Sequence, residues 1–136
     1  MRYAAVLVLV EQGHAWAQYE LGLMHANGYG APKDDAEAVK WYTKAAEQDY
    51  HAAQYNLCMM YAAGTGVPED YVQAYKWLVL ASVGTPDAKN LDRVKWKIAK
   101  RLRERLQGNM TEEQLAEANR LASEWIEKFK AKQDGD

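Results

Sequence analysis

The spacing of apolar residues along the chain predicts helices joined by glycine-rich loops. Ala38, Trp41, Tyr42 and Ala45 stand at positions i, i+3, i+4 and i+7, so they share one face of a helix. The preceding residues 27–32 (Asn-Gly-Tyr-Gly-Ala-Pro) are a dense run of turn-forming residues. This part of the chain is therefore predicted to form a helix, a tight loop and a second helix.

The same pattern occurs twice in the chain. Residues 17–46 align without a gap on residues 53–82, a shift of 36 positions (53 − 17), and many aligned residues are identical, among them Trp41 and Trp77. A fixed period of this length is typical of an array of stacked structural repeats.

Glycine and aspartate are expected to define the ends of each loop. Gly30 and Gly66 occupy equivalent loop positions, where a positive φ or a close backbone approach is expected. Asp34 and Asp70 then stand where a helix N-cap is needed, with Glu37 or its equivalent three residues further on. Both second helices should therefore begin directly after these aspartates.

The two copies resemble the Sel-one-like repeat, a relative of the tetratricopeptide repeat. In the first copy the matching residues are Ala17, Leu21, Gly22, Gly28, Gly30, Asp34, Ala38, Trp41, Tyr42, Ala45 and Ala46. In the second copy they are Ala53, Leu57, Tyr61, Gly64, Gly66, Val67, Asp70, Ala74, Trp77 and Ala81. The departures are His25, Cys58 and Leu78, where the family has tyrosine, glycine and a second aromatic residue. The resemblance implies an all-α fold, a right-handed α–α superhelix (solenoid) of stacked helix–loop–helix repeats.

The period also suggests how the chain is divided. We expect a single domain over residues 1–136, which begins with an incomplete leading repeat at residues 1–14. Two repeats follow at residues 15–50 and 51–86, and a C-terminal capping pair of helices occupies residues 87–136. Residues 110–118 resemble the closing segment of bacterial Sel-one-like proteins.

The apolar run from Tyr3 to Val10 is open to three interpretations. It is far too short to span a bilayer, which needs about 20 residues. A short signal peptide would have a minimal apolar region, and cleavage after it would destroy the first repeat. The period favours the second helix of an incomplete repeat. The compartment is therefore left open, with the cytoplasm favoured over the periplasm or secretion.

An incomplete repeat would leave part of its apolar helix uncovered. We expect self-association of the chain as a two-fold homodimer through this helix. The residues assigned to the contact are Val6, Leu7, Leu9 and Val10.

The C-terminal part departs from the period. Residues 87–107 form one long helical pattern that is rich in lysine and arginine: Lys89, Arg93, Lys95, Lys97, Lys100, Arg101, Arg103 and Arg105. This helix either presents an ordinary solvated face or binds an acidic partner. A final helix begins at Thr111 with Gln114 in a capping box. The residues from Lys130 onward are expected to form a frayed tail.

Composition and motifs give no indication of catalysis. Cys58 is the single cysteine, and His14, His25 and His51 show no metal-ligand spacing. The glycine loops lack the features of nucleotide-binding motifs. We therefore predict no catalytic residue, no cofactor and no metal site. A net charge of −2 argues against a nucleic-acid binder.

The first helix of each repeat offers the strongest candidate for a binding surface. In tetratricopeptide-like arrays this helix lines the concave face. At 100° per residue, the side chains that point away from the paired helix are Trp16, Tyr19, Leu23, Asn27, Tyr55, Met59 and Ala63, which we call the interaction strip. Neither tyrosine of the strip is expected to face the core of its helix pair. Ordinary contacts between repeats would explain the same residues without a partner.

The resemblance implies a non-catalytic adaptor or scaffold that binds a protein or peptide on its concave face. Two alternatives remain from the sequence. One is an enzyme, since a few Sel-one-like relatives were assigned hydrolase activity. The other is a fragment of a larger secreted or periplasmic adaptor.

Overall fold

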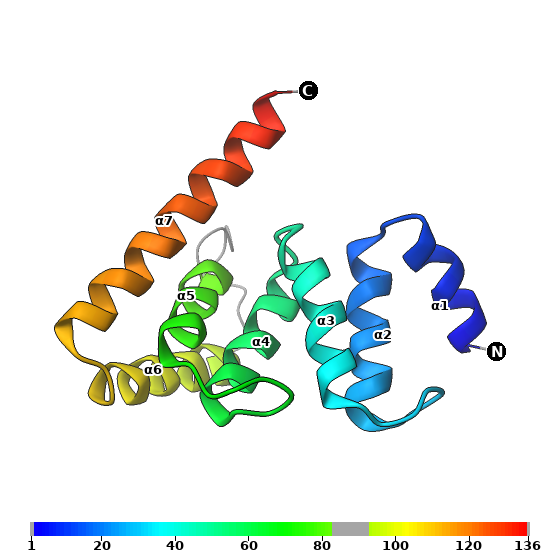
Figure 1. The fold of residues 1–136 in the computed structure, drawn as a ribbon, viewed down its shortest axis with the longest axis horizontal. Coiled ribbons are helices and arrows are strands. Elements are labelled where there is room, and N and C mark those ends of the chain that lie inside the picture. Colours follow the sequence, from blue (N-terminus) through cyan, green and yellow to red (C-terminus); the bar gives the residue numbers. More distant parts are fainter. Residues whose placement is uncertain (1, 83–92, 136) are drawn as a thin grey trace.

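The chain folds into an array of helices (Figure 1). A computed structural model describes residues 2–82 and 93–135. The described residues form α1 (Arg2–Glu11), α2 (Ala15–Asn27), α3 (Asp35–Ala46), α4 (His51–Ala63), α5 (Tyr71–Ser82), α6 (Arg93–Gly108) and α7 (Glu112–Asp134), and no strand. The predicted all-α solenoid of stacked helix pairs is confirmed.

From α1 to α6, helices that are consecutive in the sequence also pack against one another. Helices α2 and α3 form one antiparallel pair, α4 and α5 form the next, and α3 packs against α4 where the two pairs meet. Helix α1 packs on α2 at one end of the array, as expected for part of a leading repeat. At the other end α7 packs along α5.

The predicted caps mark the beginnings of the helices. The Asp34 side chain accepts a hydrogen bond from the Glu37 backbone N–H at 3.1 Å, and Asp70 accepts one from that of Gln73 at the same distance. Each bond satisfies a backbone donor that has no partner within the helix. Thr111 begins α7 with a complete capping box. These local signals were sufficient to place three helix starts from sequence.

The two repeats have loops of the same backbone shape but with different surroundings. Gly30 and Gly66 both have φ = +75°, which confirms the predicted left-handed conformation. A Cβ atom on Gly66 would lie 2.5 Å from the backbone oxygen of Asp35, at the first turn of α3. On Gly30 it would instead meet the terminal methyl of Met24 at 2.7 Å. The second loop therefore rests on the backbone of the preceding repeat, whereas the first faces a flexible side chain.

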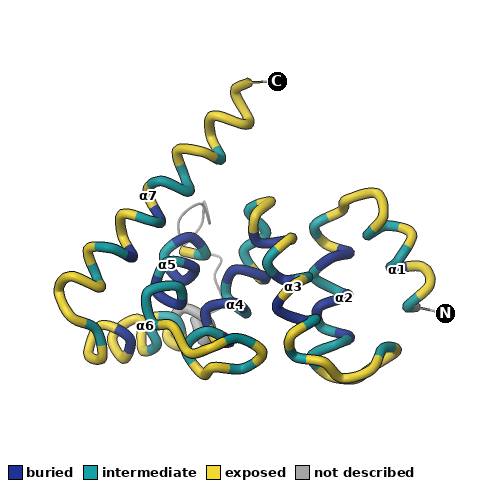
Figure 2. Tube along the Cα trace, viewed as in Figure 1, coloured by how far each residue is buried: buried dark blue, intermediate teal, exposed yellow. Residues whose placement is uncertain are grey.

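Buried residues occur along the whole array, and the apolar ones form two clusters (Figure 2). Its main cluster joins α3, α4, α5, α6 and α7, and its most fully buried members include Leu57, Cys58 and Leu80. A smaller cluster lies between α1 and α2 and is formed by Val6, Ala17, Leu21 and Met24. No helix pair buries its apolar face alone, as expected for stacked repeats.

In each helix pair, the side chains at two facing positions have complementary sizes. A Cβ atom on Gly22 would lie 2.6 Å from the ring of Tyr42, so only glycine fits beneath this buried ring. In the second repeat the equivalent positions hold Cys58 and Leu78, both buried in the same core cluster. The smaller leucine leaves room for a thiol, which explains two of the departures from the family pattern.

Buried glutamines connect the core to the turns between helices. The Gln54 Nε2 atom donates to the Ala46 carbonyl oxygen at 3.1 Å and to Asp49 Oδ1 at 3.2 Å. In the first repeat, Gln18 Oε1 accepts a bond from Gln48 Nε2 at 2.8 Å. A buried amide without hydrogen-bond partners would destabilise the fold. These bonds are therefore retained, and they fix the turns relative to the core.

The C-terminal helices differ from expectation in one respect. Helix α7 continues to Asp134, so residues 130–134 are helical, whereas a frayed tail was expected from Lys130 onward. Phe129 stacks on Trp125 with ring centroids 5.1 Å apart, which stabilises the later turns of the helix. Residues 87–92 of the predicted basic helix, and the boundary proposed between residues 86 and 87, lie outside the described residues.

The loop glycines should differ in their tolerance of a side chain. We expect Gly66→Ala to lower the free energy of unfolding by about 2–3 kcal/mol, because a strained φ and a backbone clash act together. Gly30→Ala should cost only about 1 kcal/mol, since Met24 can move. Urea unfolding followed by circular dichroism measures both, and equal losses would contradict the loop packing.

Exchange of one side-chain pair between the repeats provides a second test. Gly22→Cys should lower the free energy of unfolding by about 1–3 kcal/mol through overpacking against Tyr42. The double variant Gly22→Cys with Tyr42→Leu recreates the arrangement of the second repeat. We expect its loss of unfolding free energy to be smaller than the sum of the losses in the two single variants, by about 1 kcal/mol or more. Additive losses would show that these two positions do not compete for space.

Candidate protein-interaction surface

The residues of the interaction strip divide into exposed and supporting side chains. Trp16 is 48% exposed and Met59 is 44% exposed, large fractions for apolar residues of this size. Asn27 and Ala63 are also exposed, at the ends of α2 and α4. The supporting side chains are partly buried and pack against the main core cluster: Tyr19, Leu23 and Tyr55.

Tyr19 lies in an aromatic cluster at the junction of the two repeats. Its ring centroid is 5.8 Å from that of Tyr42 and 5.2 Å from that of Tyr50, the residue just before α4. Burial raises the pKa of the Tyr42 hydroxyl to about 12, an effect that a hydrogen bond with Asn56 of α4 partly offsets. The expectation that Tyr19 does not face the core of its helix pair is therefore wrong, because its ring contacts Tyr42 of the paired helix α3.

A small apolar hollow lies between α4 and α6, and we call it the α4–α6 cup. Its volume is about 150 Å³, and its lining residues are Met59, Ala62, Ala63, Tyr71, Leu102, Arg105, Leu106 and Asn109. Met59 and Ala63 belong to the interaction strip, so α6 extends that strip. Helix α6 is held on α5 by a bond from Gln107 Nε2 to the Tyr75 hydroxyl at 3.0 Å.

Only some of the residues that line the cup could be identified from sequence patterns. Leu102 and Leu106 belong to an apolar stripe, and Arg105 belongs to the predicted basic face. The spacing of these residues did not show that the stripe would meet the C-terminal end of α4. The contribution of Tyr71 was missed entirely, since it depends on how α5 begins beside α6.

The geometry of two equivalent helix pairs agrees with the family comparison. Residues 17–50 and 51–82 each match the family model of the Sel1 repeat. The chain belongs to the Sel1-repeat family. No curated protein sequence matches it.

Solved structures similar to this Sel1-repeat chain include two bacterial proteins. One is a protective antigen of uropathogenic Escherichia coli with an SLR fold, 36% identical, with a TM-score of 0.74 over 88% of this chain and 24% of its own. The other is a Sel1 repeat protein from Oxalobacter formigenes, 40% identical, with a TM-score of 0.56 over 57% of this chain and 32% of its own. The chain thus spans about a quarter and a third of the lengths of these relatives.

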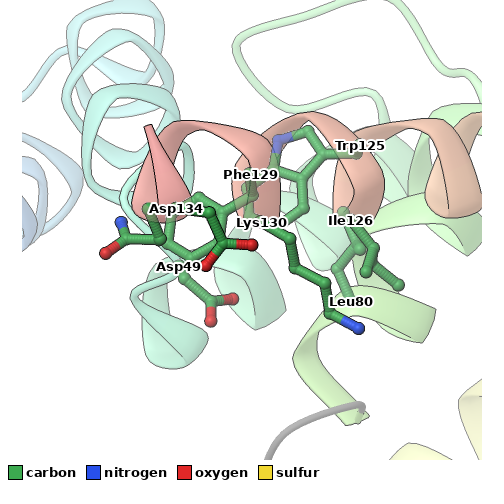
Figure 3. Close-up of a pocket in the computed structure, with 8 residues that line it drawn as sticks. Asp49, Leu80, Trp125, Ile126, Phe129, Lys130 and Asp134 are labelled. Atoms are coloured by element: carbon green, nitrogen blue, oxygen red, sulfur yellow. The ribbon is translucent and has the colours of Figure 1, made fainter. Parts of the chain in front are cut away.

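A second hollow lies under the last turns of α7 (Figure 3). It has a volume of about 460 Å³ and is lined by Asp49, Leu80, Trp125, Ile126, Phe129, Lys130, Gln133 and Asp134. Its apolar wall ends in charges of both signs, at Lys130 and at two aspartates. This hollow was not predicted from the sequence, because the residues that form one end of it were expected to be frayed.

The reactive side chains of this Sel1-repeat chain have structural surroundings. Cys58 is completely buried, and burial raises the pKa of its thiol to about 12, which removes the thiolate needed for nucleophilic attack. His25 Nδ1 lies 3.0 Å from the Pro32 carbonyl oxygen, so this histidine is hydrogen-bonded to the loop. His51 Nε2 lies 3.3 Å from Asp49 Oδ1. Among the described residues, no three metal-ligating side chains come together.

The N-terminal helix presents a different face from the one expected to self-associate. Val6 is buried against α2 and is therefore unavailable to a second copy of the chain. Leu7, Leu9 and Val10 are partly buried in the same small cluster. Val8, which the sequence analysis did not select, is 55% exposed. None of the described helices has the length and apolar character required to cross a membrane.

Proposed function

We propose that this Sel1-repeat chain is a non-catalytic adaptor module that binds a segment of a partner protein along the interaction strip. The Sel1-repeat fold supports a protein-interaction role. The observation that carries the proposal is the pair of exposed apolar side chains, Trp16 and Met59, on the equivalent helices α2 and α4. Tryptophan and methionine are enriched at the buried centres of protein interfaces relative to the rest of a protein surface.

The supporting residues make this surface rigid. Tyr19 and Tyr55 are held from below by the core, so they restrict the movement of the exposed anchors beside them. Binding to a preorganised surface loses less conformational entropy than binding to a mobile one. Aromatic and methionine side chains also provide large contact areas, which often dominate the energy of an interface.

The hydrolase alternative has no support among the described residues. The one thiol is buried with a raised pKa, and His25 is bonded to a loop carbonyl. Hydrolysis by a protein nucleophile needs an accessible nucleophile within hydrogen-bond reach of a base. An adaptor module needs neither. The proposal applies equally if the chain is part of a longer adaptor.

A displayed library of random peptides tests the interaction strip directly. The wild-type chain should enrich peptides that bind it with micromolar affinity. The double variant Trp16→Ala with Met59→Ala should bind these peptides about tenfold more weakly, or worse. Tyr29→Ala is the matched control, because Tyr29 is 76% exposed in a loop outside the strip. Peptides that bind the double variant as tightly as wild type would contradict the proposal.

The choice of variants follows from the burial of each side chain. Trp16→Ala and Met59→Ala should change the free energy of unfolding by less than about 0.5 kcal/mol, as expected for exposed positions. Tyr19→Ala should cost about 1–3 kcal/mol, because it removes contacts with Tyr42 and Tyr50. It is therefore unsuitable as a binding variant, and urea unfolding identifies such indirect effects.

We also propose that the chain forms a homodimer through the outer face of α1. Val8 is the exposed apolar residue of this face, and Ala4 and Ala5 beside it are exposed and small. Partly buried Leu7 would border the contact. A two-fold arrangement would bury both copies of Val8 at the centre of one self-complementary patch.

Light scattering at increasing protein concentration tests the dimer. We expect the wild-type chain to shift toward twice the monomer mass, and Val8→Lys to remain monomeric because it places like charges at the contact. Asn119→Lys, an exposed control on α7 at the other end of the array, should still dimerise. A wild-type chain that stays monomeric at high concentration would refute the proposed contact.

A further inference from the structure

The α4–α6 cup combines an apolar hollow with Arg105, a cation for which the described residues provide no carboxylate partner. We propose that the cup binds one apolar side chain of an acidic peptide segment and that Arg105 binds a carboxylate next to that side chain. This inference rests on the proposed function and specifies which segment the interaction strip selects. It assigns a specificity role to α6, which lies outside the two matched repeats.

The size and lining of the cup suit a single side chain. A volume of about 150 Å³ is comparable to that of an apolar cavity able to hold a benzene molecule. The walls are formed by the side chains of Met59, Ala62, Tyr71 and Leu102, and buried Leu106 closes one side. Leucine or phenylalanine would therefore fill the hollow without any rearrangement of the helices.

The positive charge of Arg105 at the rim of the cup determines which peptide residue would bind next to the anchoring side chain. Arg105 is exposed, and no carboxylate among the described residues forms an ion pair with it. The nearby Asp70 carboxylate already accepts the backbone N–H of Gln73 as a helix cap. An arginine with free donors binds carboxylates through two parallel hydrogen bonds. A glutamate or aspartate beside the anchoring side chain would complete the pair.

The rest of α6 extends the same combination of charge and apolar surface. Its sequence contains seven lysines and arginines against one glutamate, whereas the whole chain carries a net charge of −2. Ile98 is exposed one turn before Leu102, so the apolar stripe continues beyond the cup. Such a local positive field attracts acidic segments and increases their rate of association.

A peptide fits these observations better than a nucleic acid or a membrane. Phosphate backbones and anionic lipids are bound by basic surfaces as a whole, and they do not require a hollow the size of one side chain. The cup also lies directly beside Met59 of the interaction strip. A peptide bound at Met59 would therefore also reach the hollow that Arg105 borders.

The same displayed peptide library, used with two charge-reversal variants, provides the test. We expect the wild-type chain to enrich peptides with an aspartate or glutamate next to a leucine or phenylalanine. Arg105→Glu should weaken the binding of a selected synthetic peptide by about tenfold or more, because a charge-assisted hydrogen bond is replaced by repulsion between like charges. Arg103→Glu is the matched control, with the same change of charge on the same helix but outside the cup, and should weaken it less than about threefold.

Two further measurements make the assignment specific. Replacing the acidic residue of the peptide by lysine should restore binding to Arg105→Glu while abolishing binding to wild type. Ala63→Phe should fill the cup and block binding of the peptide. Because position 63 is exposed, the fold should remain intact, as measured by circular dichroism and urea unfolding. Both effects require that the peptide's charge and its apolar side chain occupy the cup together.

The possible outcomes separate this inference from the proposed function. Peptides without acidic residues that still depend on Trp16 and Met59 would overturn the role of Arg105 and leave the interaction strip in place. Failure to enrich any peptide would overturn both proposals. Equal weakening by Arg105→Glu and Arg103→Glu would show general electrostatic attraction and reject the cup. Tighter binding to a short DNA duplex or to anionic vesicles than to the selected peptides would also reject it.

Discussion

The two Sel1 repeats are joined at Tyr42, and the rest of the array depends on this contact. The ring lies directly over Gly22 of its own helix pair and beside Tyr19, and its hydroxyl is hydrogen-bonded to Asn56 of the next repeat. One buried side chain thus fixes both the distance within the first pair and the position of the second. Because each pair exposes an apolar face when alone, this junction makes the array one cooperative unit.

The same junction determines which residues are available for binding. Tyr19 and Leu23 are drawn into the contact between repeats, so they support the surface instead of projecting from it. Trp16 and Met59 remain about half exposed, because the described helices cover each of them only in part. The surface is therefore a rigid base with a few projecting anchors, an arrangement that combines low entropic cost with specific contacts.

Helix α6 modifies the repeat plan at the point where the period ends. It carries a concentrated positive charge, yet it is anchored by buried Leu106 and by the bond from Gln107 to Tyr75. This anchoring positions Arg105 beside the C-terminal end of α4. A helix that helps to close the array can therefore also alter what the array selects, because its polar face is not constrained by the core.

Local features of the fold could be predicted from the sequence because their causes are local. The loops follow from glycines at +75°, the helix starts from Asp34, Asp70 and Thr111, and the repeat itself from a shift of 36 positions (53 − 17). Each involves residues only a few positions apart, or a direct comparison of two copies. The sequence also indicated that Cys58 occupies a confined position, because the repeat pattern has a glycine there.

Only the tertiary structure decided how separate elements meet. Helical spacing shows which residues share a face, but it does not identify the helix that will cover that face. Val6 and Val8 are two residues apart on one apolar helix, yet one is buried and the other exposed because α2 lies on one side only. For the same reason the turns of α7 beyond Lys130 and the cup around Arg105 could not be read from the chain. Both are created by contacts between residues far apart in sequence, where the repeat period no longer gives a guide.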